Sequence, residues 1–333
     1  MRPRAWTGAA ALLVLGVVSL LFFQFYLFYF TPYQKQQDLG IVDVPFGATV
    51  QETAEILSQQ GWIPWVPGFV VLVRLTESSG PIRAGEYRLT ADMSPWEVLD
   101  HLRKGSVVLH KVTVPEGLRG TDVAGIVMEK LSLSRARFME LFTDSELIHS
   151  LGLSTTSLEG YLLPETYAFP KNVTEEQVIR KMVQELLNFF DEEKRRRAQD
   201  LGMTLHQILT LASIIEKEVG VESESPRISS VYHNRMRKKM LLQSDPTVIY
   251  GIEDFDGNLR WKDLKEDTPY NTYLRPGLPP TPIANPGKAS ILAALSPEET
   301  DYLYFVSRND RTHIFSRNLA DHNRAVDRYQ KRR

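Results

Sequence analysis

The sequence predicts an α+β protein with one N-terminal membrane-spanning helix and two further parts that follow it. Three observations predict this class. The chain has 333 residues, which suggests about two domains. The run from Ala5 to Phe30 carries no charge, and strand-like and helix-like patterns alternate through the remainder. The net charge of −2 gives no electrostatic reason to expect nucleic acid as a partner. The absence of cysteine excludes disulfides, thiol chemistry and cysteine-bound metals.

Residues 5–30 are expected to form an uncleaved transmembrane helix. At about 1.5 Å per residue the run is long enough to cross a hydrocarbon core of about 30 Å. A cleaved signal peptide is the alternative, but the run ends in "FYLFYFTPY", which lacks a small-residue cleavage site. Arg2 and Arg4 favour a cytoplasmic N-terminus at residues 1–4. Residues 31–39 then form a polar stalk, and the rest of the chain lies outside the cytoplasm, held at the cytoplasmic (inner) membrane.

Residues 40–110 are expected to form a small strand–helix–helix–strand unit. The stretches "VPFGATVQETAEI" (44–56) and "VPEGLRGTDVAGI" (114–126) share a pattern in register, unless the likeness is chance similarity of turn chemistry. Each predicts a strand end, a Pro/Gly turn and a helix capped by Thr49 or Thr121. Between them, "EYRL" alternates like a strand, and a helix begins after Ser94 and ends at Gly105.

Residues 111–333 predict a second, larger α+β part. Helical patterns fill most of 120–200, except for the irregular segment "EGYLLPETYAFP" (159–170). Two more helices are expected over 204–220 and 225–240. The proline-rich, aromatic stretch 268–287 predicts an ordered loop, and 303–316 predicts a hairpin around an Asn-Asp turn.

Glu216 and Glu218 are two residues apart in "LTLASIIEKEVG", near the end of the helix expected over 204–220. On a helical projection they flank the apolar face at roughly 70° and 90° from its centre. Gly220 is expected as the left-handed residue that ends the helix. The helix dipole and partial burial both raise the pKa of a carboxyl group there, as a general acid requires. A solvated pair of surface glutamates is the alternative, and periodicity does not choose between the two residues.

Longer motifs carry a resemblance to a known family. The run "LASIIEKEVGVESESPRISSVYHNRMRKKMLLQSDPTVIYG" (211–251) is similar to the signature of the endolytic murein transglycosylases, the YceG-like or MltG family. "EGYLLPETYAF", "YNTY", "GLPPTPIANPG", "YLYFV" and "HIFS" occur in that family's order. The resemblance implies a LysM-like subdomain at 40–110 and a lytic-transglycosylase-type catalytic domain at 111–333. It also implies cleavage of peptidoglycan strands between N-acetylmuramic acid and N-acetylglucosamine, which leaves 1,6-anhydromuramoyl ends.

The resemblance implies that Glu218 is the catalytic residue, with Glu216 as second choice. Lytic transglycosylases carry a catalytic Glu at a helix end, commonly followed by Ser or Thr, whereas Val219 follows Glu218 here. One carboxyl group is enough, because the muramoyl 6-hydroxyl is the nucleophile. Glu218 would protonate the leaving oxygen and then accept the proton of that hydroxyl. No metal and no cofactor are implied.

Seven further residues are candidates for binding the glycan. Amide, hydroxyl, carboxyl and aromatic groups of this kind bind sugars. The alternatives are a turn cap at Asp245 and simple packing at Glu159, Glu165 and Tyr167. Asn234 and Arg235 are expected to brace the catalytic helix, and His313 is expected to be structural. The seven candidates are Gln243, Asp245, Tyr270, Asn271, Glu159, Glu165 and Tyr167.

The expected partners are peptidoglycan glycan strands, the membrane and peptidoglycan synthases, with a role as a terminase of glycan polymerisation. Two other functions remain open at this stage. The chain could be a non-catalytic, glycan-binding scaffold of the cell-wall synthesis machinery. It could also be a hydrolase that uses Glu218 together with Asp245.

Overall fold

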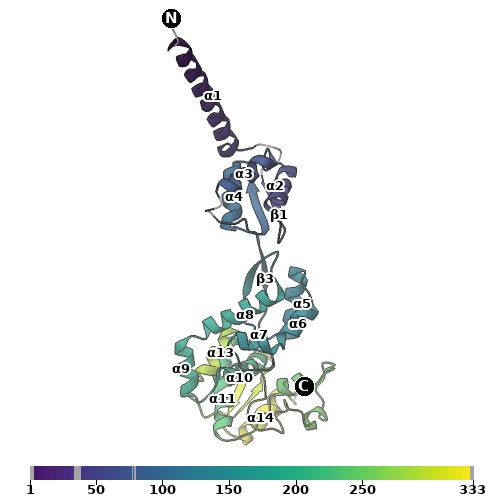
Figure 1. The fold of residues 1–333 in the computed structure, drawn as a ribbon. Helices are drawn as coiled ribbons and strands as arrows, with labels where there is room; N and C mark the ends of the chain where they lie inside the picture. Colours follow the sequence, from purple (N-terminus) through teal and green to yellow (C-terminus); the bar gives the residue numbers. More distant parts are fainter. Residues whose placement is uncertain (1–3, 34–38, 77, 79, 331–333) are drawn as a thin grey trace. The chain divides into compact units, whose positions relative to one another are not determined.

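The computed structural model describes residues 4–33, 39–76, 78 and 80–330 (Figure 1). Within this part, helices are combined with three two-stranded sheets, so the expected mixture of helix and sheet is confirmed. The described chain divides into two compact units. The first contains the residues up to 110 together with 168–173, and the second contains 111–167 and the residues from 174 onward.

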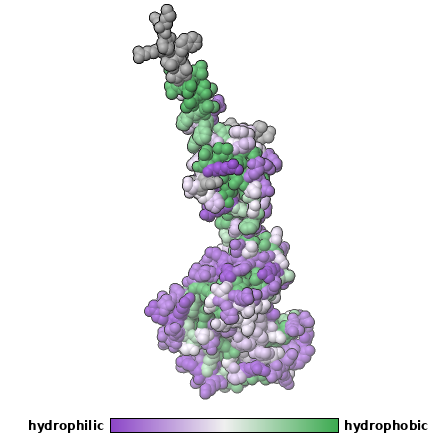
Figure 2. All heavy atoms as spheres, viewed as in Figure 1, coloured by the Kyte–Doolittle hydropathy of each residue, from purple (hydrophilic) through white to green (hydrophobic). Residues whose placement is uncertain are grey.

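The N-terminal helix α1 (Arg4–Phe30) contains a stretch, Leu12–Phe30, that is long and apolar enough to cross a membrane by length and composition. Its mean hydropathy is 2.2, and only 6% of the stretch is buried. Figure 2 shows the hydrophobic colour along this helix. Of the expected cytoplasmic residues 1–4 and stalk 31–39, positions 1–3 and 34–38 lie outside the described residues.

The first unit contains a strand–helix–helix–strand order, as the sequence predicts. It consists of β1 (Leu39–Val44), α2 (Val50–Gln59), α3 (Val66–Leu75), β2 (Gly85–Thr90) and α4 (Pro95–Lys104). Strands β1 and β2 pair antiparallel, with Val42 opposite Tyr87, and both of these side chains are buried in the core. Thr49 and Ser94 cap α2 and α4 through reciprocal bonds with Glu52 and Glu97, which confirms both predicted caps.

The repeated V-P-x-G pattern marks two similar turns. Gly47 follows β1 with φ 81°, and Gly117 follows β3 (Leu109–Thr113) with φ 73°. Both glycines are therefore in the left-handed region, where a side chain is strained. The predicted cap at Thr121 is wrong, because α5 (Gly120–Leu131) has its cap position at Arg119, two residues earlier. The carboxylate of Glu159 accepts the hydrogen bond of the Gly120 amide instead, at 3.0 Å.

Helices continue through the first half of the second unit. After α5 come α6 (Arg135–Phe142), α7 (Ser145–Ser150), α8 (Glu175–Phe189) and α9 (Glu192–Asp200). The segment 159–170, expected to be irregular, ends in the strand β4 (Thr166–Pro170), which pairs with β3. Its side chains alternate between exposed and buried over β4, a two-residue period that the flanking prolines obscure in the sequence.

The second half of this unit surrounds the helix α10 (Leu205–Glu218) (Figure 1). Helix α10 packs against α11 (Ser225–Arg237) and α13 (Lys288–Leu295). The hairpin β5 (Tyr304–Ser307) and β6 (His313–Ser316) confirms the predicted one, and α14 (Leu319–Tyr329) packs against it. The remaining short elements are η2 (Glu222–Glu224), α12 (Asp245–Tyr250) and η3 (Asp263–Lys265).

Two predicted helix ends need correction. Helix α11 stops at Arg237, three residues before the predicted end, and Lys239 then adopts φ 56°. Gly220 is not the left-handed end of α10, because the chain leaves the helix through Val219 in an extended conformation. A side chain at position 220 would collide with the carbonyl of Arg311. Glycine is thus needed there for the close approach of the β5–β6 turn.

Candidate active site

Helix α10 places its two C-terminal glutamates at the edge of the core. Thr204 caps its first turn by accepting a hydrogen bond from the Gln207 amide at 3.2 Å, and Gln207 accepts one from the Thr204 amide. An apolar face then fixes the helix in the core through Ile208, Leu209, Leu211, Ala212, Ile214 and Ile215, all fully buried. Glu218 is the last helical residue, so its position is set by the whole buried helix.

The two glutamates point to different surroundings. Glu216 Oε2 accepts a hydrogen bond from the Gly287 amide at 3.1 Å. Glu218 Oε1 accepts one from Ser244 Oγ at 2.7 Å and one from the Tyr232 hydroxyl at 3.2 Å. Among the described residues, no hydrogen-bond partner lies on Glu218 Oε2. The structure thus separates the pair that helical periodicity left equivalent.

The surroundings of Glu218 favour its protonated form. Burial raises the pKa of the Glu218 carboxyl, and the nearby negative charge of Asp245 raises it further. The hydrogen bonds from Ser244 and Tyr232 and the proximity of His313 act in the opposite direction, and the net pKa remains above its ordinary value. Glu218 is therefore suited to keep a proton at a pH where most surface carboxyl groups have lost theirs.

Glu218 opens onto a pocket of about 770 Å³. Its walls come from α10, α11, the segment 242–245, the hairpin β5–β6 and helix α14. The pocket combines aromatic rings, amides, hydroxyls and charged groups, which suits a polar ligand with apolar faces. Beside Glu218, the residues that line the pocket include Tyr232, Arg235, Gln243, Asp245, Trp261 and Tyr273.

Arg235 holds the segment that carries the hydroxyl partner of Glu218. Its side chain is 8% exposed. Its guanidinium donates to the carbonyl of Leu303 at 2.7 Å and to that of Leu242 at 2.8 Å. Nη1, which donates to Leu242, also donates to the carbonyl of Leu241 at 3.2 Å. These bonds tie the segment before Ser244 to the region of β5, whereas the sequence predicts that Arg235 braces helix α10 itself.

The "YNTY" motif supports this segment from the other side. Thr272 accepts a hydrogen bond from the Gln243 amide with its carbonyl and one from the Ser244 amide with Oγ1, at 3.1 and 3.0 Å. Asn271 is fully buried and donates to the carbonyls of Leu264 and Glu266. Neither Asn271 nor Tyr270, whose hydroxyl bonds Thr281 at 2.9 Å, lines the pocket at Glu218.

Gln243 and Asp245 do line the pocket, and both are exposed. Gln243 adopts φ 50°, which directs the chain into the Ser244 turn. The Tyr273 hydroxyl donates to Asp245 Oδ1 at 2.6 Å, so the carboxylate is held beside the pocket. The structure thus brings Gln243 and Asp245 together with Glu218.

The other three candidates lie elsewhere in the unit. Glu165 is paired with Lys288 at 2.7 Å, and the buried Tyr167 donates to the carbonyl of Leu163 at 2.5 Å. Glu159 is 5% exposed, and accepts hydrogen bonds from the Gly120 amide and the Tyr250 hydroxyl. None of these three lines the pocket at Glu218. Glu159 closes the N-terminus of α5.

The Glu159 carboxyl gives a prediction about stability. Burial raises its pKa from 4.5 to about 7, although the bonds from Gly120 and Tyr250 act against this. Since the folded state binds this proton more tightly than the unfolded state, stability must fall as pH rises through the interval between these values. The loss amounts to about 3 kcal/mol once the group is ionised in both states.

Glu159→Gln should remove this loss, because glutamine keeps an acceptor for the Gly120 amide and has no proton to release. We therefore compare the free energy of unfolding of the variant with that of the wild type. The difference, variant minus wild type, should be larger at pH 8 than at pH 4.5. Denaturant unfolding of both chains across this pH range measures the difference. A difference that does not change with pH would contradict the assignment.

Sequence reasoning missed several residues of the pocket. Ser244 lies between two predicted residues, but an isolated serine gives no signal of its contact with a helix 26 residues earlier in the chain. Trp261 is 73% exposed at the pocket, with Lys265 Nζ 5.6 Å from its ring. An exposed tryptophan in a loop was the one available signal. His313 lines the pocket, and its Nδ1 lies 2.8 Å from Glu224 Oε2, so it also ties the hairpin to η2.

A partly buried carboxyl group with a raised pKa, set in an open polar and aromatic pocket, is a feature typical of enzyme sites that use general acid–base catalysis. Among the residues that the structure describes, no group of three or more His, Asp or Glu side chains is placed to hold a metal ion.

Residues 42–328 match the YceG-like family, and the chain belongs to this family. It is 33% identical over 315 residues to the endolytic murein transglycosylase of Bacillus subtilis, covering 90% of this chain and 87% of that one. It is 28% identical to the protein of the same name from Streptococcus pneumoniae strain D39, covering 86% of this chain and 57% of that one. A crystal structure of a yceG-like protein from Listeria monocytogenes superimposes with a TM-score of 0.60 at 32% identity, over 87% of this chain and 99% of that one. The family resemblance of the sequence is confirmed.

Proposed function

We propose that this chain is a membrane-anchored endolytic lytic transglycosylase that cleaves peptidoglycan strands with Glu218 as its catalytic residue. The observation that carries the proposal is the position of Glu218. It lies at a helix end and lines a pocket, and the pKa of its carboxyl group is raised. The relatives named endolytic murein transglycosylase support the substrate. Gln243 and Asp245, which line the same pocket, are proposed to bind the sugars.

The proposed reaction uses one carboxyl group twice. Glu218 donates the proton on Oε2 to the glycosidic oxygen, and the bond between this oxygen and C1 of N-acetylmuramic acid breaks. The oxocarbenium-like centre at C1 is then attacked by the 6-hydroxyl of the same sugar, whose proton passes to Glu218. Ser244 and Tyr232 stabilise the carboxylate between the two steps through Oε1. No water is consumed, and the products are a 1,6-anhydro end and a free 4-hydroxyl group.

Three finer assignments belong to the same proposal. The first unit acts as a LysM-like subdomain, which is supported by its β1–α2–α3–β2 order. The enzyme acts on nascent strands as a terminase of glycan polymerisation, beside peptidoglycan synthases. Helix α1 anchors it in the cytoplasmic membrane with its N-terminus inside, in agreement with Arg2 and Arg4 before the apolar run.

End-group analysis of the products tests the reaction. Purified glycan strands incubated with the full chain should yield internal cuts with anhydro ends. Reducing ends would instead indicate a hydrolase that uses Glu218 with Asp245. An absence of cleavage, with binding retained, would indicate the non-catalytic scaffold.

The topology of the anchor is tested by a fusion. A reporter enzyme placed after Arg333 should be active when it requires export, because residues 39–330 are proposed to lie outside the cytoplasm. A reporter that requires the cytoplasm should be inactive at the same position. The opposite pair of results would reverse the orientation, and release of the fusion from membranes would indicate a cleaved signal peptide.

Trp261 should bind one sugar ring of the strand by stacking, since its exposed ring forms part of the pocket wall. Trp261→Ala should raise KM about tenfold, as expected for a loss of about 1–2 kcal/mol of contact with an aromatic ring. Trp261→Phe should raise KM less, because phenylalanine keeps an aromatic ring. An unchanged KM for Trp261→Ala would remove this residue from the binding site.

Fluorescence offers an independent test of the same contact. Trp261 is the only tryptophan of the sequence beyond position 96. Glycan fragments should therefore change the emission of the inactive Glu218→Gln chain, and Trp261→Phe in that background should abolish the change. The other tryptophans, which set the background signal, are Trp6, Trp62, Trp65 and Trp96.

A further inference from the structure

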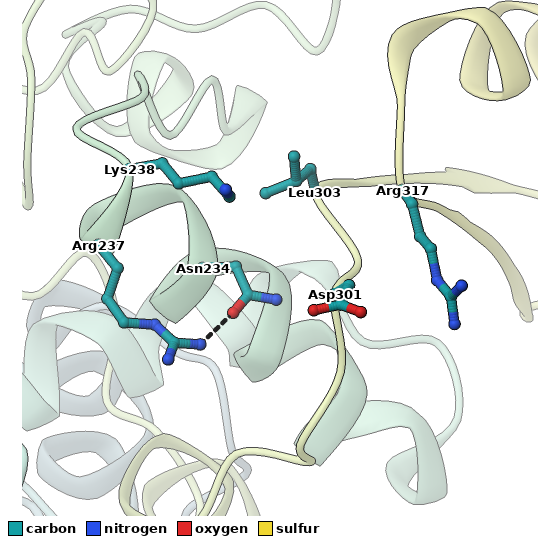
Figure 3. A pocket seen from close by; sticks show the side chains of 6 residues that line it. All are labelled: Asn234, Arg237, Lys238, Asp301, Leu303 and Arg317. Carbon is teal, nitrogen blue, oxygen red and sulfur yellow. Dashed lines mark hydrogen bonds between the residues drawn. The ribbon is translucent and has the colours of Figure 1, made fainter.

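We propose that a second pocket of this unit binds the peptide carried by the glycan strand, through its carboxylates and one amine. This inference rests on the proposed function and adds a peptide-recognition site to it. The pocket has a volume of about 500 Å³ and is separate from the one at Glu218. It is lined by Asn234, Arg237, Lys238, Asp301, Leu303 and Arg317 (Figure 3). We call it the cationic pocket.

The cationic pocket is built by segments that are far apart in the sequence. Figure 3 shows Asn234, Arg237 and Lys238 around the end of α11, with Arg317 on the chain after β6. The wall between them is fixed, because the buried Asn234 side chain donates to the carbonyls of Thr300 and Tyr302 at 2.8 and 2.9 Å. Arg237 is oriented by a hydrogen bond to Asn234 Oδ1. The site therefore exists before any ligand binds.

The charges of this pocket are not neutralised by one another. Among the described residues, Arg237, Lys238 and Arg317 form no ion pair with a carboxylate. Asp301 in the same pocket forms none either, although Arg237 is bonded to Asn234 and Arg317 lies over the ring of Tyr302, so no carboxylate of the described residues neutralises these three cations. By contrast, Arg227 on the same helix is paired with Glu298 at 3.0 Å. Cations at the end of α11 also suit the helix dipole, but this does not explain Arg317, which comes from another segment.

This charge pattern favours a peptide over a phosphate polymer. Guanidinium groups match carboxylates in geometry, and an excess of two positive charges would attract a ligand with two carboxylates. Asp301 would repel a phosphodiester chain but can accept hydrogen bonds from an ammonium group. In a short peptide with two carboxylates and one free amine, the amine would pair with Asp301 and the carboxylates with two of the three cations.

The cationic pocket adjoins the pocket at Glu218. Neighbouring residues contribute to the two sites: Asn234 to one and Arg235 to the other, and likewise Leu303 and Tyr304. Arg235 Nε donates to the Leu303 carbonyl at 2.7 Å, so a single layer of backbone and side chain separates them. A peptide attached to a sugar near Glu218 would therefore have the cationic pocket as a neighbouring site.

The experiment compares two substrates, peptide-bearing glycan strands and the same strands stripped of peptide by an amidase. Lys238→Gln/Arg317→Gln in the full chain should lower kcat/KM at least about tenfold on peptide-bearing strands, mainly through KM. Cleavage of stripped strands should stay close to the wild-type rate. Calorimetry with the free peptide and the Glu218→Gln chain should show weaker binding when the same two substitutions are added.

Lys239→Gln/Arg328→Gln is the matched control. Like the pocket variant, it removes one lysine just after α11 and one arginine that lies over a tyrosine ring, since Arg317 lies over Tyr302 and Arg328 over Tyr329. Neither Lys239 nor Arg328 lines the cationic pocket. This control variant should behave like the wild type on both substrates. The proposal is overturned if the pocket variant loses activity equally on both substrates, if it loses none, or if a glycerol-phosphate polymer binds the pocket more tightly than the peptide. If the wild type cleaves neither substrate, the proposed function fails, and calorimetry alone decides on the pocket.

Discussion

Glu218→Gln should abolish glycan cleavage while the protein remains folded. Glutamine keeps the shape of the side chain and an acceptor for Ser244 and Tyr232, but it has no proton to donate. Loss of general acid–base catalysis costs about 10²–10⁴-fold in rate. The loss should approach the upper limit here, because the same carboxyl group serves both proton transfers. Release of anhydromuropeptides by the purified variant measures the effect.

Thermal unfolding of the same variant should show that the fold survives. Since the pKa of Glu218 is raised in the folded protein, its ionisation destabilises the folded state as pH rises above the ordinary value for a carboxyl group. Removal of the ionisable group should therefore leave Tm at neutral pH equal to that of the wild type or higher. A variant that fails to fold would show that Glu218 is a structural residue.

Glu216→Gln is the matched control on the same helical turn. Its carboxylate accepts a hydrogen bond from the Gly287 amide and lies outside the pocket, so most of the activity should remain. A folded but inactive Glu216→Gln, together with an active Glu218→Gln, would reverse the assignment of the two glutamates.

Arg235→Lys should have the second largest effect, on both stability and rate. A lysine ammonium cannot replace the guanidinium fork that reaches Leu303 on one side and Leu242 on the other. The buried carbonyl of Leu242 and the partly buried carbonyl of Leu303 would be left without donors, at a cost of about 1–3 kcal/mol for a buried group. The segment that carries Ser244 and Asp245 would shift, and a displacement of about 1 Å can lower the rate about 10²-fold.

Denaturant unfolding and kcat on stripped strands measure the two effects. Arg227→Lys is the control, since this half-exposed arginine of the same helix pairs with Glu298 at the surface. It should change stability by less than about 1 kcal/mol. A wild-type kcat for Arg235→Lys at its reduced stability would mean that Arg235 supports the fold without positioning the site.

Local patterns predicted most of the elements around the site. The apolar period of 205–219 predicts α10 and places both glutamates at its border, which is where the structure has them. The caps at Thr49 and Ser94 follow from neighbouring residues, and so does the β5–β6 hairpin. These features depend on interactions within a few residues, which a sequence displays directly.

Features that depend on distant residues were not predictable in this way. Whether Glu216 or Glu218 faces a pocket is decided by Ser244, the hairpin and α14, which come later in the chain. Thr121 has the residue type of a cap, but the amide of Gly120 is bonded instead by Glu159, which lies 39 residues after Gly120. Gly220 lies where a left-handed residue usually ends a helix. Glycine is needed there for another reason, because a side chain would collide with the backbone of Arg311.

The "YNTY" segment illustrates the same limit for binding residues. Its residue types are those that bind sugars, but in the structure Thr272 and Asn271 support the Ser244 turn and the loop around it. Conversely, Val219 provides no hydroxyl group beside Glu218, and Ser244 and Tyr232 provide two from elsewhere. Glu218 therefore has hydroxyl donors, although they do not come from the next residue in the chain, where lytic transglycosylases commonly have Ser or Thr.

In the proposed reaction the muramoyl 6-hydroxyl, and not water, completes the step that Glu218 begins. Cleavage of purified strands in ¹⁸O-labelled water tests it most directly, with mass spectrometry of the new ends. We expect anhydromuramoyl ends without label from the wild type, and no new ends from Glu218→Gln. Reducing ends that each carry one ¹⁸O atom would contradict it, and would show that the enzyme is a hydrolase.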